Sequence, residues 1–220
     1  MLIFYIIILM VFYEECMIKE FLPYETVRND ALKIAYKMYN EDSFTPDVIY
    51  CSLRGGAYMA NVISEYYKIV RKDHHPVLYA AVVARSYSDV RQATPRVYVD
   101  GWTYPPANLR PGDKILLVDD IFDTGHTINA LVNILLDYGV PRENIKVVVH
   151  DYKEFTYREK LPILPDYWCR KFVISKPEED RWIHYMSHEL VGLSKKELEE
   201  NYFNKDPELR KILEPILGNK

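Results

Sequence analysis

A run of apolar residues that ends directly in carboxylates is the feature that most constrains the fold of this 220-residue chain. Residues 115 to 118, Ile-Leu-Leu-Val, have the length and branching of a buried parallel strand, and Asp119 and Asp120 come where that strand should end. Ligands of open α/β sheets bind at the carboxyl ends of the strands, so a binding site is expected here. The stretch closes with Asp123, Thr124, Gly125, His126 and Thr127.

These residue types suit a phosphorylated sugar. Two adjacent carboxylates beside an apolar strand are costly unless a cation or sugar hydroxyls engage them, and either Mg2+ or a ribose diol would suit Asp119 and Asp120. Gly125 lets the backbone turn closely into a helix, whose first N–H groups and dipole favour an anionic phosphate. The pattern therefore predicts a site that combines sugar, cation and phosphate binding.

The stretch resembles the motif of type I phosphoribosyltransferases that binds 5-phosphoribosyl 1-diphosphate (PRPP). That motif is a short apolar strand, Asp-Asp, two residues, Asp-Thr-Gly, one residue and Thr, and residues 115 to 127 match all of it. The resemblance implies that Asp119 and Asp120 face the ribose hydroxyls and Mg2+, and that residues 123 to 127 hold the 5'-phosphate. It also implies that Asp123 is the catalytic general base, which accepts the N7 proton of a purine.

A different family, the isoprenoid synthases, carries a DDxxD motif that also binds Mg2+ and diphosphate. That motif lies within a long helix of an all-α protein. Here β-branched residues precede the acids and a Thr-Gly pair follows them, and both disfavour a continuous helix. We therefore expect an α/β protein with the type I phosphoribosyltransferase fold, an open and mostly parallel sheet flanked by helices, with a small hood and a C-terminal helical extension.

A second glycine turn follows another short apolar strand, at residues 48 to 51. Both turns should lie at the same edge of the sheet, since parallel strands end together there. In the family, a loop of this form contacts pyrophosphate and commonly contains a cis peptide bond, which would be Leu53-Arg54 here. The residues of this predicted pyrophosphate loop are Ser52, Leu53, Arg54, Gly55 and Gly56.

The acceptor base is expected to meet residues of the carboxyl-terminal third. Lys153 and Trp182 resemble the lysine and the stacking aromatic of 6-oxopurine phosphoribosyltransferases, with Ile183 beside them; a lysine donates to the exocyclic O6 and an indole stacks on a purine. Ser86 and Tyr87 resemble the start of the mobile catalytic loop. Residues 185 to 189 lack the Pro-Trp-Glu of xanthine/guanine relatives. Transfer to adenine, orotate or uracil, and a PRPP-sensing regulator without catalysis, therefore stay open.

The remaining pattern predicts alternating strands and helices. Apolar spacing indicates a helix over residues 24 to 40, and further strands are expected at residues 77 to 84, 145 to 150 and 170 to 174. Residues 86 to 113 contain four prolines, three of them at positions 105, 106 and 111, and are predicted to form a long irregular loop that acts as a lid. Ser194 and Glu197 fit a capping box, and Asp206 followed by Pro207 fits the start of a last helix.

The composition, with 49% hydrophobic and 27% charged residues, indicates an ordinary soluble globular protein. Its net charge of −4 favours neither nucleic acid nor anionic membrane. We expect residues 1 to 16 to be an apolar extension, too short to span a bilayer and lacking the basic start of a secretory signal. We expect either that Met17 is the natural start or that the extension packs as an extra strand; the alternative is a weak membrane tether. Residues 17 to 190 should form the phosphoribosyltransferase domain with its hood, and residues 191 to 220 a helical extension.

Three widely spaced cysteines, Cys16, Cys51 and Cys169, lack the spacing of a zinc site and indicate reduced thiols in the cytoplasm. The resemblance implies Mg2+ as cofactor, PRPP and a purine base as small-molecule substrates, and a homodimer or homotetramer. It places the reaction in purine salvage.

Overall fold

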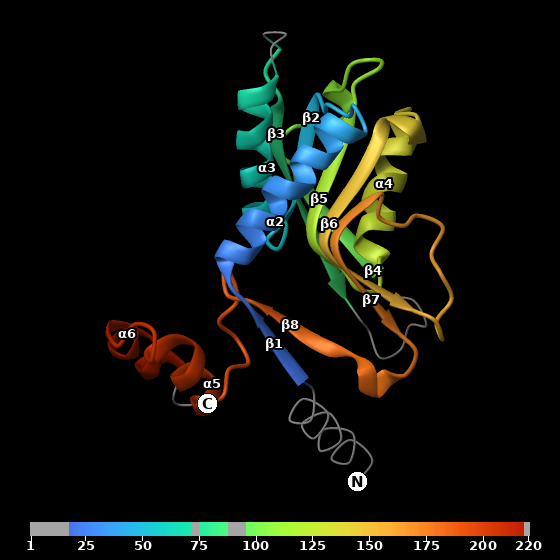
Figure 1. The fold of residues 1–220 in the computed structure, drawn as a ribbon. Helices are drawn as coiled ribbons and strands as arrows, with labels where there is room; N and C mark the ends of the chain where they lie inside the picture. The colour runs from blue at the N-terminus through green and yellow to red at the C-terminus, as the bar shows by residue number, and fades with distance from the viewer. Residues whose placement is uncertain (1–17, 72–74, 88–95, 218–220) are drawn as a thin grey trace. The chain divides into compact units, whose positions relative to one another are not determined.

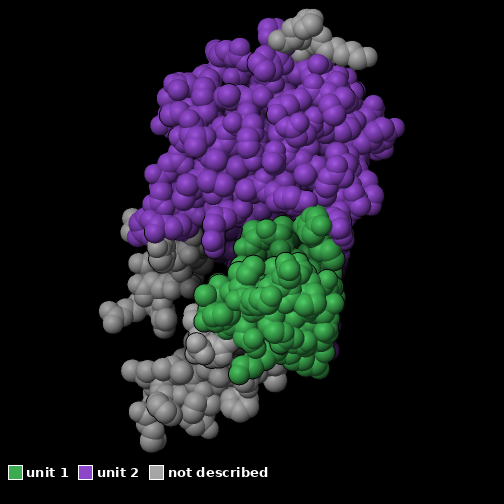
Figure 2. Space-filling view, turned by 90° about the vertical axis from the view of Figure 1, so that its left-hand side faces the viewer, with its two compact units in different colours: residues 1–24, 181–220 green, residues 25–180 purple. Residues whose placement is uncertain are grey.

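The computed structural model describes residues 18–71, 75–87 and 96–217. The chain divides into two compact units: unit 1 is made of its two ends, residues 1–24 and 181–220, and unit 2 of residues 25–180 (Figure 2). The predicted extension at residues 1 to 16 lies outside the described residues, and the domain boundaries predicted at residues 17 and 190 stay predictions.

Unit 2 contains a six-stranded sheet in the order β4-β3-β2-β5-β6-β7. Strands β3, β2, β5, β6 and β7 run parallel, and only β4 runs antiparallel, beside β3 at one edge. The predicted open, mostly parallel sheet is confirmed. Its strands are β2 (Val48–Leu53), β3 (Leu78–Tyr87), β4 (Arg96–Trp102), β5 (Ile115–Phe122), β6 (Ile145–Phe155) and β7 (Tyr167–Ile174).

Helices cover both faces of this sheet (Figure 1). Helices α2 (Tyr24–Tyr36) and α3 (Ala57–Val70) lie on one face, and α4 (His126–Asp137) lies on the other. The helix predicted over residues 24 to 40 is confirmed, although its end, η1 (Lys37–Glu41), is a π-helix. Short 3-10 turns occur at η2 (Pro106–Asn108), η3 (Arg142–Asn144) and η4 (Pro177–Glu179).

The core of unit 2 explains why the first four residues of β5, residues 115 to 118, are all apolar. Ile115 and Leu117 belong to the cluster that α4 completes through Leu131. Leu116 and Val118, on the alternate positions, are also fully buried. A strand covered on both faces favours apolar residues at every position, and Asp119 is the first charged residue of β5.

The irregular loop predicted over residues 86 to 113 is wrong for residues 86–87 and 96–102, which form strands. Strand β3 continues to Tyr87, and β4 returns antiparallel beside it from Arg96 to Trp102. Val99 and Trp102 pack against the core of unit 2, which stabilises a hairpin that the nearby prolines obscured in the sequence. Residues 103–113 are irregular as predicted, apart from the 3-10 turn η2, and residues 88–95 of the predicted lid lie outside the described residues.

Unit 1 pairs strands from the two ends of the chain. Strand β1 (Ile18–Leu22) runs parallel to β8 (Arg181–Tyr185) in a two-stranded sheet, and neither strand was predicted. The helical extension follows as α5 (Lys195–Leu198), η5 (Glu199–Phe203) and α6 (Glu208–Leu217). Its small core contains Leu198, Tyr202, Phe203 and Leu213.

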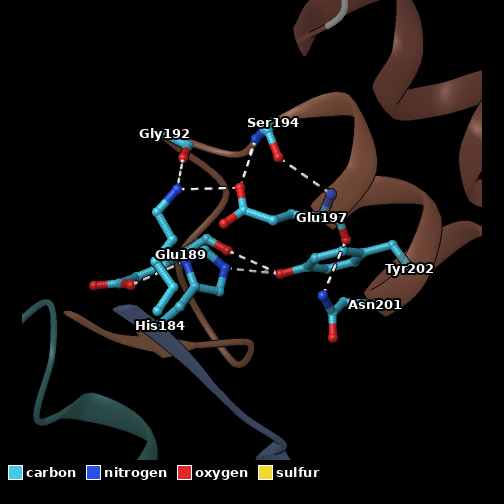
Figure 3. A network of polar contacts seen from close by, with 8 residues as sticks. His184, Glu189, Gly192, Ser194, Glu197, Asn201 and Tyr202 are labelled. Carbon is cyan, nitrogen blue, oxygen red and sulfur yellow. Dashed lines mark hydrogen bonds and ion pairs between the residues drawn. The ribbon is translucent and has the colours of Figure 1, made fainter. Parts of the chain in front are cut away.

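Polar contacts tie the helical extension to β8 (Figure 3). His184 of β8 is buried, its Nε2 lies 2.9 Å from the Tyr202 hydroxyl, and its Nδ1 lies 3.4 Å from the Glu189 carboxylate. The predicted capping box is confirmed, since the Ser194 side chain accepts from the Glu197 N–H while the Glu197 carboxylate accepts from the Ser194 N–H. The carboxyl-terminal helices are therefore an integral part of unit 1.

The start predicted for the last helix is nearly correct. Asp206 Oδ1 accepts from the Glu208 N–H at 3.0 Å, but α6 begins at Glu208, so Pro207 precedes the helix instead of opening it. Within the described ranges, no helix is both long enough and apolar enough to cross a membrane. Cys51 is buried, Cys169 is half-buried, and both are free thiols.

Candidate active site

The two glycine-containing turns meet at the carboxyl ends of β2 and β5. These strands are neighbours in register, and the pairing between them ends with Cys51 opposite Val118, so Ser52 and Asp119 follow at the same level. Ser52 lies near Asp119, and its hydroxyl lowers the pKa of that carboxyl. The structure thus brings together two motifs that lie more than sixty residues apart in the sequence.

Gly55 and Gly56 pack directly against the acidic pair. A methyl group at Gly55 would lie 2.3 Å from Asp120 Oδ1, and one at Gly56 would lie 2.3 Å from the Val118 carbonyl oxygen and 2.9 Å from Asp119 Cα. Any side chain at either position would collide with β5 or its carboxylates. Glycine is therefore required for the loop to approach the acids this closely.

The backbone of the predicted pyrophosphate loop, residues 52 to 56, has the conformation that the resemblance implied. The Leu53-Arg54 peptide bond is cis, as predicted, and the Gly56 N–H donates to the Ser52 carbonyl at 2.9 Å before α3 begins. The Arg54 side chain is exposed at the rim. The loop therefore offers an exposed cation beside the two glycines, next to the acidic pair.

The acidic pair is held by main-chain amides. Asp119 Oδ1 accepts from the Asp120 N–H at 3.1 Å, and Asp120 Oδ1 accepts from the Ile121 N–H at 2.8 Å. Burial raises the pKa of Asp119 well above its usual range, the neighbouring Asp120 carboxylate adds to the rise, and the Ser52 hydroxyl opposes it. A bound cation or sugar hydroxyls would stabilise the charged form of this pair.

Carboxylate oxygens are the donors that Mg2+ prefers, and Mg2+ usually binds one or two of them together with substrate phosphates and water. Asp119 and Asp120 fit that role. In the described part of the chain, no three His, Cys, Asp or Glu side chains gather as a metal cage. A Mg2+ ion bound here would therefore need oxygen ligands from the substrate as well.

The turn after β5 leads into α4 through a left-handed glycine. Gly125 has φ +78°, and a methyl group there would lie 2.2 Å from Cζ of Phe122. The helix begins at His126, so its first N–H groups have no partner within the helix and point toward the turn. Thr124 is exposed and Thr127 is half-buried. This turn has the form of an anion site at a helix amino terminus.

A buried asparagine that sequence reasoning missed supports this turn. The Asn129 amide donates to the Gly125 carbonyl at 3.0 Å and to the Ile163 carbonyl at 2.8 Å, and its oxygen accepts from the Ile163 N–H at 3.1 Å. Asn129 therefore fixes the turn to the segment between β6 and β7. Its signal in the sequence is a single polar residue on the apolar face of a helix.

Lys153 reaches the same edge from β6. Its side chain is only 5% exposed, and its Nζ lies 2.8 Å from Asp180 Oδ1 and 3.8 Å from Asp123 Oδ2. Partial burial raises the pKa of Asp123; Lys153 opposes that rise and the Asp180 carboxylate adds to it. Asp180 was not predicted as a site residue, because the acids of residues 178 to 180 are indistinguishable in the sequence.

The other four predicted site residues belong to strands β3 and β8. Ser86 and Tyr87 are the last two residues of β3, whose carboxyl end faces the same edge as that of β2. Trp182 and Ile183 belong to β8 of unit 1, where Trp182 is 50% exposed and Ile183 is buried. Unit 2 thus brings together the predicted residues 52 to 56, 119 to 127 and 153, while Trp182 and Ile183 lie in the other unit.

An acidic pair, a glycine loop and a helix amino terminus at one sheet edge define a site for a phosphorylated sugar, and the class that combines them on this fold is the phosphoribosyltransferases. Residues 19–172 match the family model described as "Phosphoribosyl transferase domain". This is more than half of the chain, and the chain belongs to that family. It is an enzyme of the phosphoribosyltransferase type.

The chain is also similar to individual proteins with two different names. It is 28% identical over 159 residues to the "Bifunctional protein PyrR" of Halalkalibacterium halodurans, covering 70% of this chain and 84% of that protein. It is 27% identical over 132 residues to the "Hypoxanthine/guanine phosphoribosyltransferase" of Methanopyrus kandleri, covering 58% of this chain and 64% of that protein.

Solved structures show the same fold. The purine phosphoribosyltransferase from Pyrococcus horikoshii superposes with a TM-score of 0.59 at 19% identity, covering 81% of this chain and 99% of that one. The Helicobacter pylori xanthine-guanine-hypoxanthine phosphoribosyltransferase superposes with a TM-score of 0.51 at 19% identity, covering 77% and 92%. At such identities the likeness establishes the type I phosphoribosyltransferase fold.

Proposed function

We propose that this enzyme transfers the 5-phosphoribosyl group of PRPP to a 6-oxopurine, hypoxanthine, guanine or xanthine, in a Mg2+-dependent reaction of purine salvage. The products are the nucleoside monophosphate and pyrophosphate. The observation that carries the proposal is the nearly buried ammonium of Lys153, 3.8 Å from the carboxylate of Asp123. A 6-oxopurine presents an acceptor at O6 and a proton at N7, and this pair offers a donor and a base.

The remaining roles divide between the sugar, the phosphate and the leaving group. Asp119 and Asp120 would hold the ribose hydroxyls and Mg2+, which supplies charge neutralisation for the departing pyrophosphate. The loop of residues 52 to 56 would bind pyrophosphate, and residues 123 to 127 would bind the 5'-phosphate. For the base, Trp182 would stack on the purine with Ile183 beside it. Ser86 and Tyr87 would begin a loop that excludes water.

Asp123 is proposed as the general base because its raised pKa moves it toward the range in which it can accept a proton near neutral pH. Asp123→Asn should lower kcat by about 100-fold, within the usual range for loss of a general base, while the KM for PRPP changes little. Asp137→Asn, at the exposed end of α4, is the matched control. Equal losses in kcat and PRPP affinity would contradict the assignment.

A second candidate has support from the relatives named "Bifunctional protein PyrR". Because of this similarity, two alternatives stay open. The acceptor is a base other than a purine, such as uracil, or the protein is a regulator that binds PRPP without turnover. Release of pyrophosphate should be measured with hypoxanthine, guanine, xanthine, adenine, orotate and uracil. Turnover with the first three supports the proposal, turnover with uracil supports the second candidate, and PRPP binding without turnover on any base supports the regulator.

The predicted homodimer or homotetramer and the cytoplasmic location also stay proposals. Sedimentation of the purified enzyme with and without PRPP would measure the oligomeric state, and fractionation of cells would measure the location. Retention in the membrane fraction would favour the alternative that the apolar amino-terminal extension acts as a tether.

A further inference from the structure

The Lys153 ammonium has two acidic neighbours that differ in distance. Asp180 Oδ1 lies 2.8 Å from Nζ, which is a charge-assisted hydrogen bond, whereas Asp123 Oδ2 lies 3.8 Å away, which is too far for one. The Lys153 side chain is 5% exposed and that of Asp180 is 18% exposed. A charge this deeply buried needs a partner, and the close partner is Asp180.

Asp180 is itself fixed by a turn. It follows η4, the 3-10 turn after β7, and its N–H donates to the Pro177 carbonyl at 3.1 Å. Glu179 closes the same turn, because its carboxylate accepts from the Ser175 N–H at 2.7 Å. Strand β7 lies beside β6 with Phe172 opposite Lys153. The carboxylate of Asp180 therefore reaches Lys153 from a turn that follows the neighbouring strand and is fixed by these hydrogen bonds.

We propose that Asp180 is a positioning residue for base recognition. It occupies one of the three N–H donors of Lys153 and keeps the ammonium from closing onto Asp123. The Asp123 carboxylate then stays available for a proton, and a lysine N–H stays available for an acceptor atom on the base. This inference rests on the proposed function, since it assumes that Lys153 meets the 6-oxo group.

Loss of the Asp180 charge has a definite consequence for specificity. Without it, the nearest anion to Lys153 is Asp123, and a shift of about 1 Å would turn the 3.8 Å separation into a direct ion pair. That pair would use the donor needed by the base. Recognition of the 6-oxo group should therefore weaken by about 10- to 100-fold, the range for a hydrogen bond to a charged group, while contacts to the phosphate and ribose stay unchanged.

The test uses two nucleotides that differ at position 6 and, as a consequence, in the proton on N1. Inosine 5'-monophosphate carries the oxo group, and purine riboside 5'-monophosphate lacks it. Binding of both to the full chain should be measured by titration calorimetry with Mg2+, for the wild type, Asp180→Asn and Glu178→Gln. Glu178 is an exposed acid of the same turn and serves as the matched control.

We expect the wild type and Glu178→Gln to prefer inosine monophosphate, and Asp180→Asn to lose at least about 10-fold of that preference with nearly unchanged affinity for purine riboside monophosphate. Equal weakening of both nucleotides, or no change, would overturn the role of Asp180. If Asp180→Asn does not fold, Asp180→Glu, which keeps the charge but moves it, should show a reduced preference, and an unchanged one would equally overturn it. A wild type without any preference would refute the 6-oxopurine function itself.

Discussion

The close approach of the glycine loop to the acidic pair predicts opposite consequences for two neighbouring substitutions. At Gly56, an added methyl group meets main-chain atoms only: the Val118 carbonyl oxygen at 2.3 Å, Asp119 Cα at 2.9 Å and the Val118 carbonyl carbon at 3.0 Å. At Gly55, the methyl group meets the Asp120 carboxylate, which can rotate away. Gly56→Ala should therefore damage folding, and Gly55→Ala should damage substrate binding.

The magnitudes follow from these contacts. Relief of the clash at Gly56 requires α3 or β5 to move by roughly 1 Å, and overpacking of this kind costs up to about 3 kcal/mol. Gly56 has φ −69°, a conformation in which alanine is favoured by about 1 kcal/mol, so the net loss is about 2 kcal/mol. For a chain of this length, that lowers Tm by roughly 4–8 °C. Gly55→Ala should leave Tm nearly unchanged and raise the KM for PRPP by about 10-fold.

Thermal unfolding followed by circular dichroism, together with initial rates at varied PRPP, measures both effects. Gly101→Ala is the matched control, because a methyl group at Gly101 meets no atom within 4 Å. Its Tm and KM should equal those of the wild type. The reasoning is refuted if Gly56→Ala melts within about 1 °C of the control, or if Gly55→Ala binds PRPP normally.

Three further perturbations test other parts of the structure. Arg170→Met should lower the free energy of unfolding, measured in a urea titration, by about 3–5 kcal/mol. The substitution removes the Arg170 Nε donor that lies 2.6 Å from the carboxylate of the fully buried Asp151. A loss below about 1 kcal/mol would contradict this reasoning. Gly125→Ala should weaken PRPP binding, since its φ of +78° and the Phe122 ring both oppose a side chain, and an unaltered KM for PRPP would count against the turn as a phosphate site. Burial and the Lys19 ammonium lower the pKa of His184, so the unfolded chain binds a proton more readily than the folded one. The contribution of His184 to stability should be full above about pH 6.5 and should be lost as the pH falls through the pKa of the folded state. In thermal melts His184→Gln should reduce this pH dependence, and a steeper dependence would contradict the argument.

The site motifs could be predicted because their local chemistry is unusual. Asp119 and Asp120 are the first charges after a strand buried on both faces, and Gly125 marks a turn that only glycine adopts easily. Each signal lies within a few residues. Parallel pairing of β2 with β5 then brings the two motifs together, as the alternation of strands and helices implied.

Features that depend on residues far away in the sequence were not predicted. Strand β1 exists because it pairs with β8 about 160 residues later, and a run of five residues carries no sign of that partner. The role of Asp180 depends on its distance to Lys153, which the sequence does not encode locally. In contrast, β4 did carry a signal: Val97, Val99 and Trp102 have the branched and aromatic character of a strand, but the prolines after them suggested a loop.

The pairing of β1 with β8 bears on the order in which the protein is made. Unit 2 is complete in sequence once residue 180 has been synthesised, whereas the two-stranded sheet of unit 1 needs residues 18–22 and residues 181–185 together. During synthesis, β1 therefore leaves the ribosome without β8, its pairing partner, while unit 2 emerges and folds. The strand that bears Trp182 is thus assembled last, and the nascent chain contains the proposed sugar and phosphate site before it contains the strand proposed to bind the base.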